Sequence, residues 1–276
     1  MRTRRLGSSL GPILIVAGAA ALIALERRYP LRRSVERRSG HDARNLGVAA
    51  LAAIAVQLAE RPCVAPLAAI VERRRWGVLK QLPLPPWLEA PLAVILMDYT
   101  LYLWHVLTHR VGWLWRFHLV HHVDRDLTAS TALRFHFGEL LLSVPWRAGQ
   151  IAAIGVSPAT LRLWQTLLLL SILFHHSNLR LPPQTERRLA GFIMTPRLHG
   201  IHHSTVRRER DANWSSGLTL WDRLHGTLEL NVPQDAIRIG VPGYAAPRNL
   251  SLGAILAMPF TAERPSGKAP EITKRR

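Results

Sequence analysis

Five apolar runs separated by arginine-dense stretches constrain the fold of this chain more than any other feature. They occupy residues 10–25, 46–71, 87–107, 140–156 and 161–174. A helix of about 20 apolar residues is long enough to cross a bilayer. Because lipid offers no water to backbone polar groups, such runs fold as helices rather than as open strands. The sequence therefore predicts an all-α integral membrane protein with about four transmembrane helices.

The positive charge of the chain supports a membrane protein. Lysine and arginine number 36 against 18 acidic residues, which gives a formal net charge of +18. Arginines cluster at positions 2–5, 27–44 and 73–75, beside apolar runs, as the flanks of membrane helices do. Charge alone is also compatible with nucleic-acid binding, but no recognition module accompanies it. We therefore expect no nucleic-acid partner.

Charge also predicts the topology. The stretch 27–44 has the strongest positive bias, which places it in the cytoplasm. The start MRTRR resembles a signal peptide, but it lacks a small-residue cleavage site and indicates a retained anchor. Counting the later membrane spans from the cytoplasmic stretch 27–44 puts every histidine cluster on the cytoplasmic side. We expect a bacterial inner-membrane protein with a cytoplasmic, histidine-rich helical cap.

Three regions follow from these patterns. Residues 1–86 form an N-terminal membrane anchor region, 87–230 a catalytic domain, and 231–276 a C-terminal tail that is loosely ordered after Pro259. The single cysteine, Cys63, excludes an intrachain disulfide and a cysteine-rich metal site. Arg147 interrupts the fourth apolar run, where a charge at the bilayer centre costs about 2.5–3.5 kcal/mol. Its side chain should therefore face protein, a polar cavity or a headgroup.

Eleven of the thirteen histidines lie at five places along the chain, four of which are close groups and one of which is the single His136. Positions i, i+3 and i+4 share one face of a helix, so a group with this spacing can point several imidazoles at one site. His41 and His225 have no such partners, and we interpret them as packing or surface residues. The eleven histidines are His105-x-x-x-His109, His118-x-x-His121-His122, His136, His175-His176 and His199-x-x-His202-His203.

The number of imidazoles indicates which metal centre they form. Imidazole suits zinc, copper, iron and nickel. Eight to ten neutral nitrogens exceed what one ion needs, and a catalytic zinc takes about three protein ligands. A pair of oxygen-activating iron ions would use the whole set. We therefore expect two iron ions, O2 as co-substrate and a lipid substrate that enters from the bilayer.

Two other functions compete with this interpretation. A metal transporter would line a pathway with its histidines, but it should carry polar residues through the depth of several spans. A membrane zinc hydrolase would need a carboxylate base beside its ligands, and the sequence contains no His-Glu-x-x-His. Metal analysis separates both alternatives from the oxygenase.

At these histidines the sequence resembles the fatty acid hydroxylase/sterol desaturase superfamily, over residues 91–228. The resemblance rests on ordered motifs around the histidines: Asp98-Tyr99, His105-x-x-x-His109, Trp115-Arg-Phe-His118-x-x-His121-His122, Arg134-Phe-His136-Phe-Gly-Glu139, Phe174-His-His176-Ser-Asn178, Thr195-Pro-Arg-Leu-His199-x-x-His202-His203 and Trp221-Asp-Arg-Leu-His225-Gly-Thr227. It departs from many relatives at Asn213-Trp214-Ser215, where they have Asn-Tyr-Gly, and at His225, where they have Phe.

The resemblance implies an enzyme that hydroxylates or desaturates a fatty acyl, sterol or carotenoid-type lipid. It implies no catalytic group beyond the metal ligands. Glu139 and Asn178 would orient imidazoles from outside the ligand set. The implied ligands of the two irons are His105, His109, His118, His121, His122, His199, His202 and His203, with His136 and His176 as further ligands.

Electrons for such a reaction must come from another protein. The sequence carries no flavin fingerprint, haem-binding domain or cysteine-ligated cluster. We therefore expect an external ferredoxin-like or reductase-like donor, for which the basic cytoplasmic face is a docking site.

Overall fold

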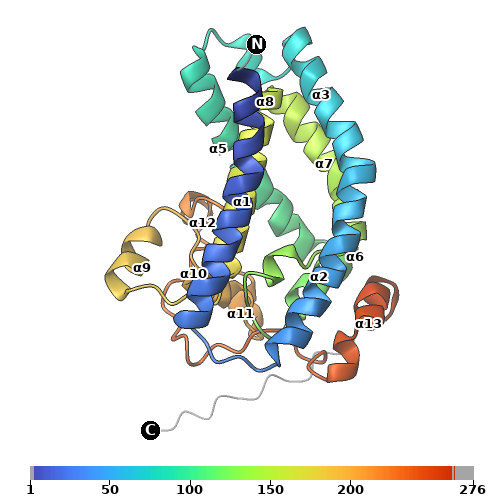
Figure 1. The fold of residues 1–276 in the computed structure, drawn as a ribbon, viewed down its shortest axis with the longest axis vertical. Coiled ribbons are helices and arrows are strands. Elements are labelled where there is room, and N and C mark those ends of the chain that lie inside the picture. The colour runs from blue at the N-terminus through green and yellow to red at the C-terminus, as the bar shows by residue number, and fades with distance from the viewer. Residues whose placement is uncertain (1–2, 263, 265–276) are drawn as a thin grey trace.

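The computed structural model describes residues 3–262 and residue 264, and the regular secondary structure of this part of the chain is helical (Figure 1). Its only β pairings are three isolated bridges. The prediction of an all-α protein is therefore confirmed. The longer helices are α1 (Thr3–Arg28), α2 (Arg38–Ala55), α3 (Arg61–Arg74), α5 (Pro86–Arg110), α6 (Gly112–His122), α7 (Phe137–Ile154) and α8 (Pro158–His176). The shorter ones are α4 (Val78–Gln81), α9 (Pro183–Leu189), α10 (Pro196–His202), α11 (Arg207–Arg210), α12 (Leu220–Leu224) and α13 (Leu252–Ala257), with 3-10 turns η2 (Thr131–Leu133), η3 (Pro247–Leu250) and η4 (Met258–Phe260).

The long helices pack lengthwise, and the short helices from α9 to α13 gather toward one end (Figure 1). α1 packs on α8, α2 and α3 pack on α7, and α5 contacts both α7 and α8. The packed apolar side chains between them include Val64, Val71, Met97 and Ile151. This bundle holds the ends of α5, α6 and α8 together beside the short helices.

The second apolar run is interrupted, as its polar residues predict. Between α2 and α3 the chain forms a five-residue π-helix, η1 (Val56–Glu60). A π turn inserts extra backbone into a helix and often marks a functional site. Here η1 brings Val56 and Glu60 to the wall of a cavity described below.

The fourth and fifth apolar runs form a helical hairpin, as expected. α7 ends at Gly155, whose φ of 93° is readily adopted only by glycine. The hairpin then starts α8 with Ser157 as N-cap, accepting a hydrogen bond from the Thr160 N–H at 3.1 Å, and with Pro158 in the first turn. These signals explain why the turn takes only three residues.

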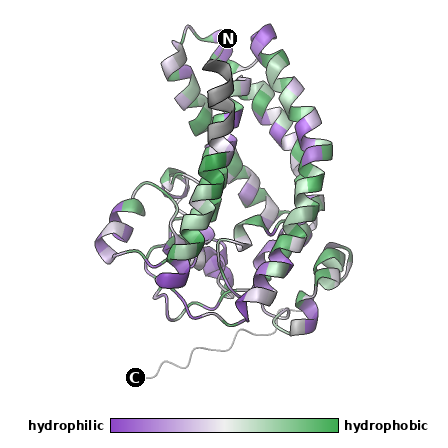
Figure 2. Cartoon of the chain, in the orientation of Figure 1, coloured by the Kyte–Doolittle hydropathy of each residue, from purple (hydrophilic) through white to green (hydrophobic). Residues whose placement is uncertain are grey.

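Within the described residues, two stretches are long and apolar enough to cross a membrane, Arg38–Gln81 and Trp87–Arg110. Large apolar side chains are exposed along the bundle, including Val16, Leu58 and Leu163. The middle lengths of α1, α2 and α3 are mainly hydrophobic, whereas the loops at the histidine end are mainly hydrophilic (Figure 2). An exposed apolar surface of this kind suits lipid rather than water.

The two ends of the bundle differ in what they carry. The basic stretch 27–44 lies at the histidine end, where Arg32 Nη2 donates to the Pro196 carbonyl oxygen at 2.9 Å. At the other end, Gly77 packs closely on the turn at Gly155. A Cβ atom on Gly77 would lie 2.2 Å from the backbone nitrogen of Gly155.

Part of the segment predicted as a tail packs on the histidine end. Val241, Tyr244, Leu250 and Ile255 form an apolar cluster with Leu119 of α6. The expected loose order after Pro259 concerns residues that lie mostly outside the described part of the chain.

Candidate metal centre

Four helices bring the histidines to one place. α5 and α6 meet near Val111, and α8 and α10 approach from the other side. α10 is short but well defined, because Thr195 accepts a hydrogen bond from the Leu198 N–H at 3.4 Å and Pro196 occupies the first turn. Residues 199, 202 and 203 then share one face of this turn of helix.

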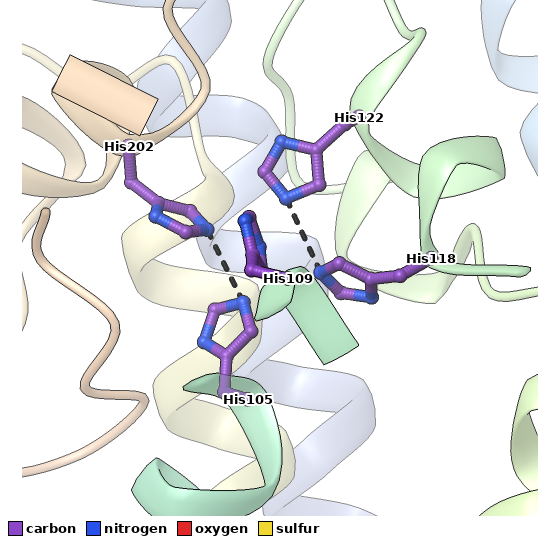
Figure 3. Close-up of side chains that lie close together, drawn as sticks. All are labelled: His105, His109, His118, His122 and His202. Carbon is purple, nitrogen blue, oxygen red and sulfur yellow. Dashed lines mark hydrogen bonds between the residues drawn. The ribbon is translucent and has the colours of Figure 1, made fainter. Parts of the chain in front are cut away.

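The first group joins five histidines from three helices. His105 and His109 of α5, His118 and His122 of α6, and His202 of α10 each offer a ring nitrogen within 4.8 Å of the others. The Nε2 atoms of His105 and His202 lie 3.2 Å apart, as do those of His118 and His122. The five rings point toward one another (Figure 3).

The second group joins four buried histidines: His121, His176, His199 and His203. The Nε2 atom of His176 lies 2.9 Å from that of His121 and 3.0 Å from that of His199. The two groups are adjacent, since the rings of His122 and His203 stack with their centroids 4.3 Å apart.

The donor set fits two metal ions. Nitrogens that bind one ion at about 2.0–2.1 Å lie about 3 Å apart when they are at right angles, and the paired Nε2 atoms have this separation. His109 Nε2 is buried and has no hydrogen-bond partner among the described residues. Burial, reinforced by neighbouring imidazoles, holds the pKa of His199, His202 and His203 well below its ordinary value. These rings are therefore neutral, which is the form that binds metal.

Outer contacts fix four of these imidazoles. Three of them face backbone carbonyl oxygens through Nδ1, at 2.6–2.8 Å. His105 faces the carbonyl of Trp214, His176 that of Ile172, and His202 that of Ala212. The fourth, His118 Nδ1, lies 2.8 Å from Glu139 Oε1. Such contacts set the tautomer so that Nε2 presents its lone pair. Glu139 thus lies where an orienting residue was expected.

Two of the residues expected at the site are placed elsewhere. His136 belongs to neither histidine group, because its Nδ1 accepts the Gly138 N–H at 2.9 Å as the N-cap of α7. Its Nε2 faces the Leu256 carbonyl oxygen at 3.2 Å. Among the described residues Asn178 forms no hydrogen bond with an imidazole, and its side-chain amide pairs with the backbone N–H and carbonyl oxygen of Arg32. It joins α8 to the segment that follows α1.

Three other histidines join neither group. His175 is buried, and its ring centroid lies 4.1 Å from that of His199. His225 is exposed and stacks on Tyr102 with ring centroids 5.0 Å apart. His41 is buried and bonded to Asp124 at 2.8 Å.

Sequence reasoning missed the acidic residues that hold the site's loops. Asp222 accepts the N–H groups of Trp214 and Ser215, both at 3.0 Å, and so holds the carbonyl that contacts His105. Asp98 of α5 accepts the Trp221 indole N–H at 2.7 Å. Both aspartates stood in the motifs quoted above, but nothing in their spacing indicates these partners.

A cavity of about 320 Å³ opens directly on the histidines. His105 and His118 of the first group and His121 of the second line it. Away from the histidines, its wall is mainly apolar and comes from α5, α7 and α8, with Leu101, Leu140, Leu168 and Ile172 among the lining residues. Cavities of this size and character bind small organic ligands.

Comparison with known proteins places the chain in a family. Residues 90–227 match the fatty acid hydroxylase family, and this segment contains every histidine of both groups. No solved structure matches the chain.

Three relatives illustrate the range of similar proteins. The ornithine lipid hydroxylase OlsE of Rhizobium tropici is 28% identical over 261 residues, which cover 90% of this chain and 75% of that protein. Cholesterol 25-hydroxylase of Mus musculus is 29% identical over 50% of this chain and 45% of its own length. Alkylglycerol monooxygenase of Homo sapiens is 30% identical over 52% of this chain and 30% of its own length. The chain belongs to the fatty acid hydroxylase family, whose members are oxidoreductases.

Proposed function

We propose that the protein is a membrane di-iron oxygenase that uses O2 to hydroxylate or desaturate a lipid. The observation that carries this proposal is the pair of adjacent histidine groups at the end of an apolar cavity. One group has five histidines and the other has four. A transporter is not favoured, because these nine histidines gather at one end of the bundle rather than through its depth.

The expected ligands are the nine grouped histidines, with His176 among them and His136 outside. Iron bound there would supply the oxidant that removes hydrogen from an unactivated C–H bond. The chain's own part is to hold the imidazoles and exclude water. Apolar side chains such as Leu168 and Ile172 line the cavity that leads to them, and a dry cavity strengthens each electrostatic contact within it.

The substrate is proposed to be a membrane lipid. Relatives bear names that refer to an ornithine lipid, a sterol and an alkylglycerol, all of which reside in bilayers. The cavity lies between α5, α7 and α8, whose outer faces carry exposed apolar residues such as Ile95, Leu141 and Leu163. A lipid could therefore reach the cavity laterally without crossing water.

The membrane placement follows the same geometry. We propose that α1, the stretch from α2 to α3, α5 and the α7–α8 hairpin lie in a bacterial inner membrane. The histidine end would face the cytoplasm, because it carries the basic stretch 27–44. Fusions of a reporter at Gly40 and after Lys268 should both give cytoplasmic signals, and opposite signals would refute this span count.

An external electron donor is proposed to dock at the histidine end. A concave surface there, about 1670 Å³ in volume, is lined by nine arginines and only three acidic residues. This surface lies next to α10, where Arg32 packs against Gly200. Gly200 stands between His199 and His202 in the sequence. An acidic ferredoxin-like or reductase-like protein would be attracted to such a surface. A docked donor would be separated from the ligands by about one helix diameter, about 10 Å.

Metal and lipid analysis tests the function directly. The purified protein should contain about two iron ions per chain. Membranes of cells that express it should contain a lipid that has gained one oxygen atom or lost two hydrogen atoms, relative to cells without the gene. Both are read by mass spectrometry. Zinc in place of iron, with no altered lipid, would contradict the oxygenase.

Replacing Glu139 tests the outer contact to His118. In Glu139→Ala, the His118 ring loses the partner that fixes its tautomer. We expect the apparent affinity for iron to fall by about 10- to 100-fold, as is usual when such a partner is removed. Iron retention under increasing chelator concentration measures this affinity. The retention of Glu139→Gln should lie between that of Glu139→Ala and that of the wild type, because its amide oxygen can still accept a hydrogen bond. Equal retention in all three proteins would show that Glu139 does not act on the metal.

A further inference from the structure

Arg147 is a buried cation in the apolar half of the bundle. Its side chain lies on α7 with 9% of its surface exposed, which confirms that it faces the protein interior. Its guanidinium carbon lies 4.3 Å from the centre of the Trp164 ring. Among the described residues it forms no hydrogen bond and no ion pair, and its buried Nε lacks an acceptor. A buried guanidinium without an anionic partner is costly, so this one calls for an acceptor.

The acceptor can come from the cavity that opens on the histidines. Arg147 lines that cavity, together with Ser143 and the apolar side chains of Leu140 and Leu168. Glu60, from the π-helix, lines it as well and lies near enough to act electrostatically on Arg147, but the two form no ion pair. Arg147 therefore remains open to an oxygen atom of a bound molecule.

The helix sets the distance between this cation and the histidines. Glu139, whose carboxylate contacts His118, is eight residues before Arg147 on α7. At 1.5 Å per residue the two backbones are about 12 Å apart along the axis. An extended chain that advances about 3.3–3.6 Å over three bonds covers this distance in about ten bonds. One end of a lipid chain could thus lie at Arg147 while a carbon lies at the histidines.

We propose that Arg147 binds an anionic oxygen group of the lipid substrate, a carboxylate or a phosphate, and so selects which carbon reaches the metal centre. This inference rests on the proposed function, because it takes the bound lipid to be the substrate. The binding itself is measured independently of turnover. Guanidinium pairs with planar or tetrahedral oxyanions through two parallel N–H bonds, which a neutral alcohol cannot match. The cavity should therefore prefer charged amphiphiles to neutral ones of the same length.

Equilibrium binding to the purified protein in a neutral detergent tests the preference. The probes are palmitate, hexadecyl phosphate and hexadecanol, which share a chain and differ in the end group. We expect at least one of the two anions to bind about tenfold or more tightly than the alcohol, and the tighter anion identifies the group. In Arg147→Met the affinity for that anion should fall by about tenfold, while that for hexadecanol changes by less than about twofold. Equal anion binding by wild type and variant would overturn the proposal.

Two further variants separate binding from structure. Glu60→Gln should bind the anion more tightly, because a competing carboxylate is gone. If Arg147 does not contact the bound anion, removing the Glu60 charge leaves anion binding unchanged, and the proposal fails even if Arg147→Met does not fold. The matched control is Arg162→Met, an exposed arginine on α8, which should bind all three probes like the wild type. Failure of the proposed function would show instead as missing iron or unaltered lipids, with this binding pattern intact.

Discussion

Replacing His202 by alanine is expected to abolish turnover and to lower bound iron from about two ions per chain to about one. His202 belongs to the first group, and its Nε2 lies 3.2 Å from that of His105. Removing this ring leaves a vacant coordination position in a buried site. A pair of oxygen-activating iron ions does not tolerate a mobile ion. His199→Ala should do the same to the second group. Iron per chain, measured by mass spectrometry, and product formation in membranes check both.

His136 provides the matched control. It is a buried histidine close to the site, but it serves as the N-cap of α7 rather than as a member of either group. His136→Ala should therefore keep its iron and lose about 1 kcal/mol of stability, the usual cost of removing a cap. If His202→Ala and His199→Ala kept both iron and activity, the two groups would not be a shared metal site. Iron loss in His136→Ala would instead return His136 to the ligand set.

The sequence predicted the helices and the grouping of the histidines because both depend on local spacing. Apolar runs long enough to cross a bilayer fold as helices in lipid, and His118, His121 and His122 share one face of such a helix because of their spacing. The start of α10 is local as well, since Thr195 and Pro196 are ordinary signals for a first turn. Each of these features depends on residues within a few positions of one another, so the order of residues is enough to predict it.

The placements of His136 and Asn178 could not be predicted from spacing, because distant partners decide them. His136 faces the Leu256 carbonyl, which is 120 residues away in sequence, and Asn178 pairs with Arg32, 146 residues away. A histidine beside other histidines looks the same in the sequence whether it binds a metal or caps a helix. The same limit applies to His41, whose partner Asp124 is 83 residues away.

Asp124 is expected to be among the residues that the fold tolerates losing least. Its carboxylate is fully buried and bonds to His41 at 2.8 Å, to Thr131 Oγ1 at 2.9 Å and to Asn45 Nδ2 at 3.1 Å. Arg134, also fully buried, lies 3.9 Å away. Burial alone would raise the pKa of Asp124, but Arg134 and His41 hold it well below its usual value, so the carboxylate is charged. This network ties α2 to the segment directly after the α6 histidines.

Asp124→Asn removes the charge while keeping the volume, and it leaves Arg134 buried without its nearest anion. Breaking a buried pair in this way costs about 3–5 kcal/mol. For a chain of this size we expect the unfolding temperature in detergent to fall by about 10 °C. Asp211→Asn is the control, because its partners Arg110 and Arg207 are surface residues and such pairs contribute about 1 kcal/mol or less. Equal unfolding temperatures for the two variants would show that the buried network does not hold α2 against the helices that carry the histidine groups, and that their alignment depends on apolar packing alone.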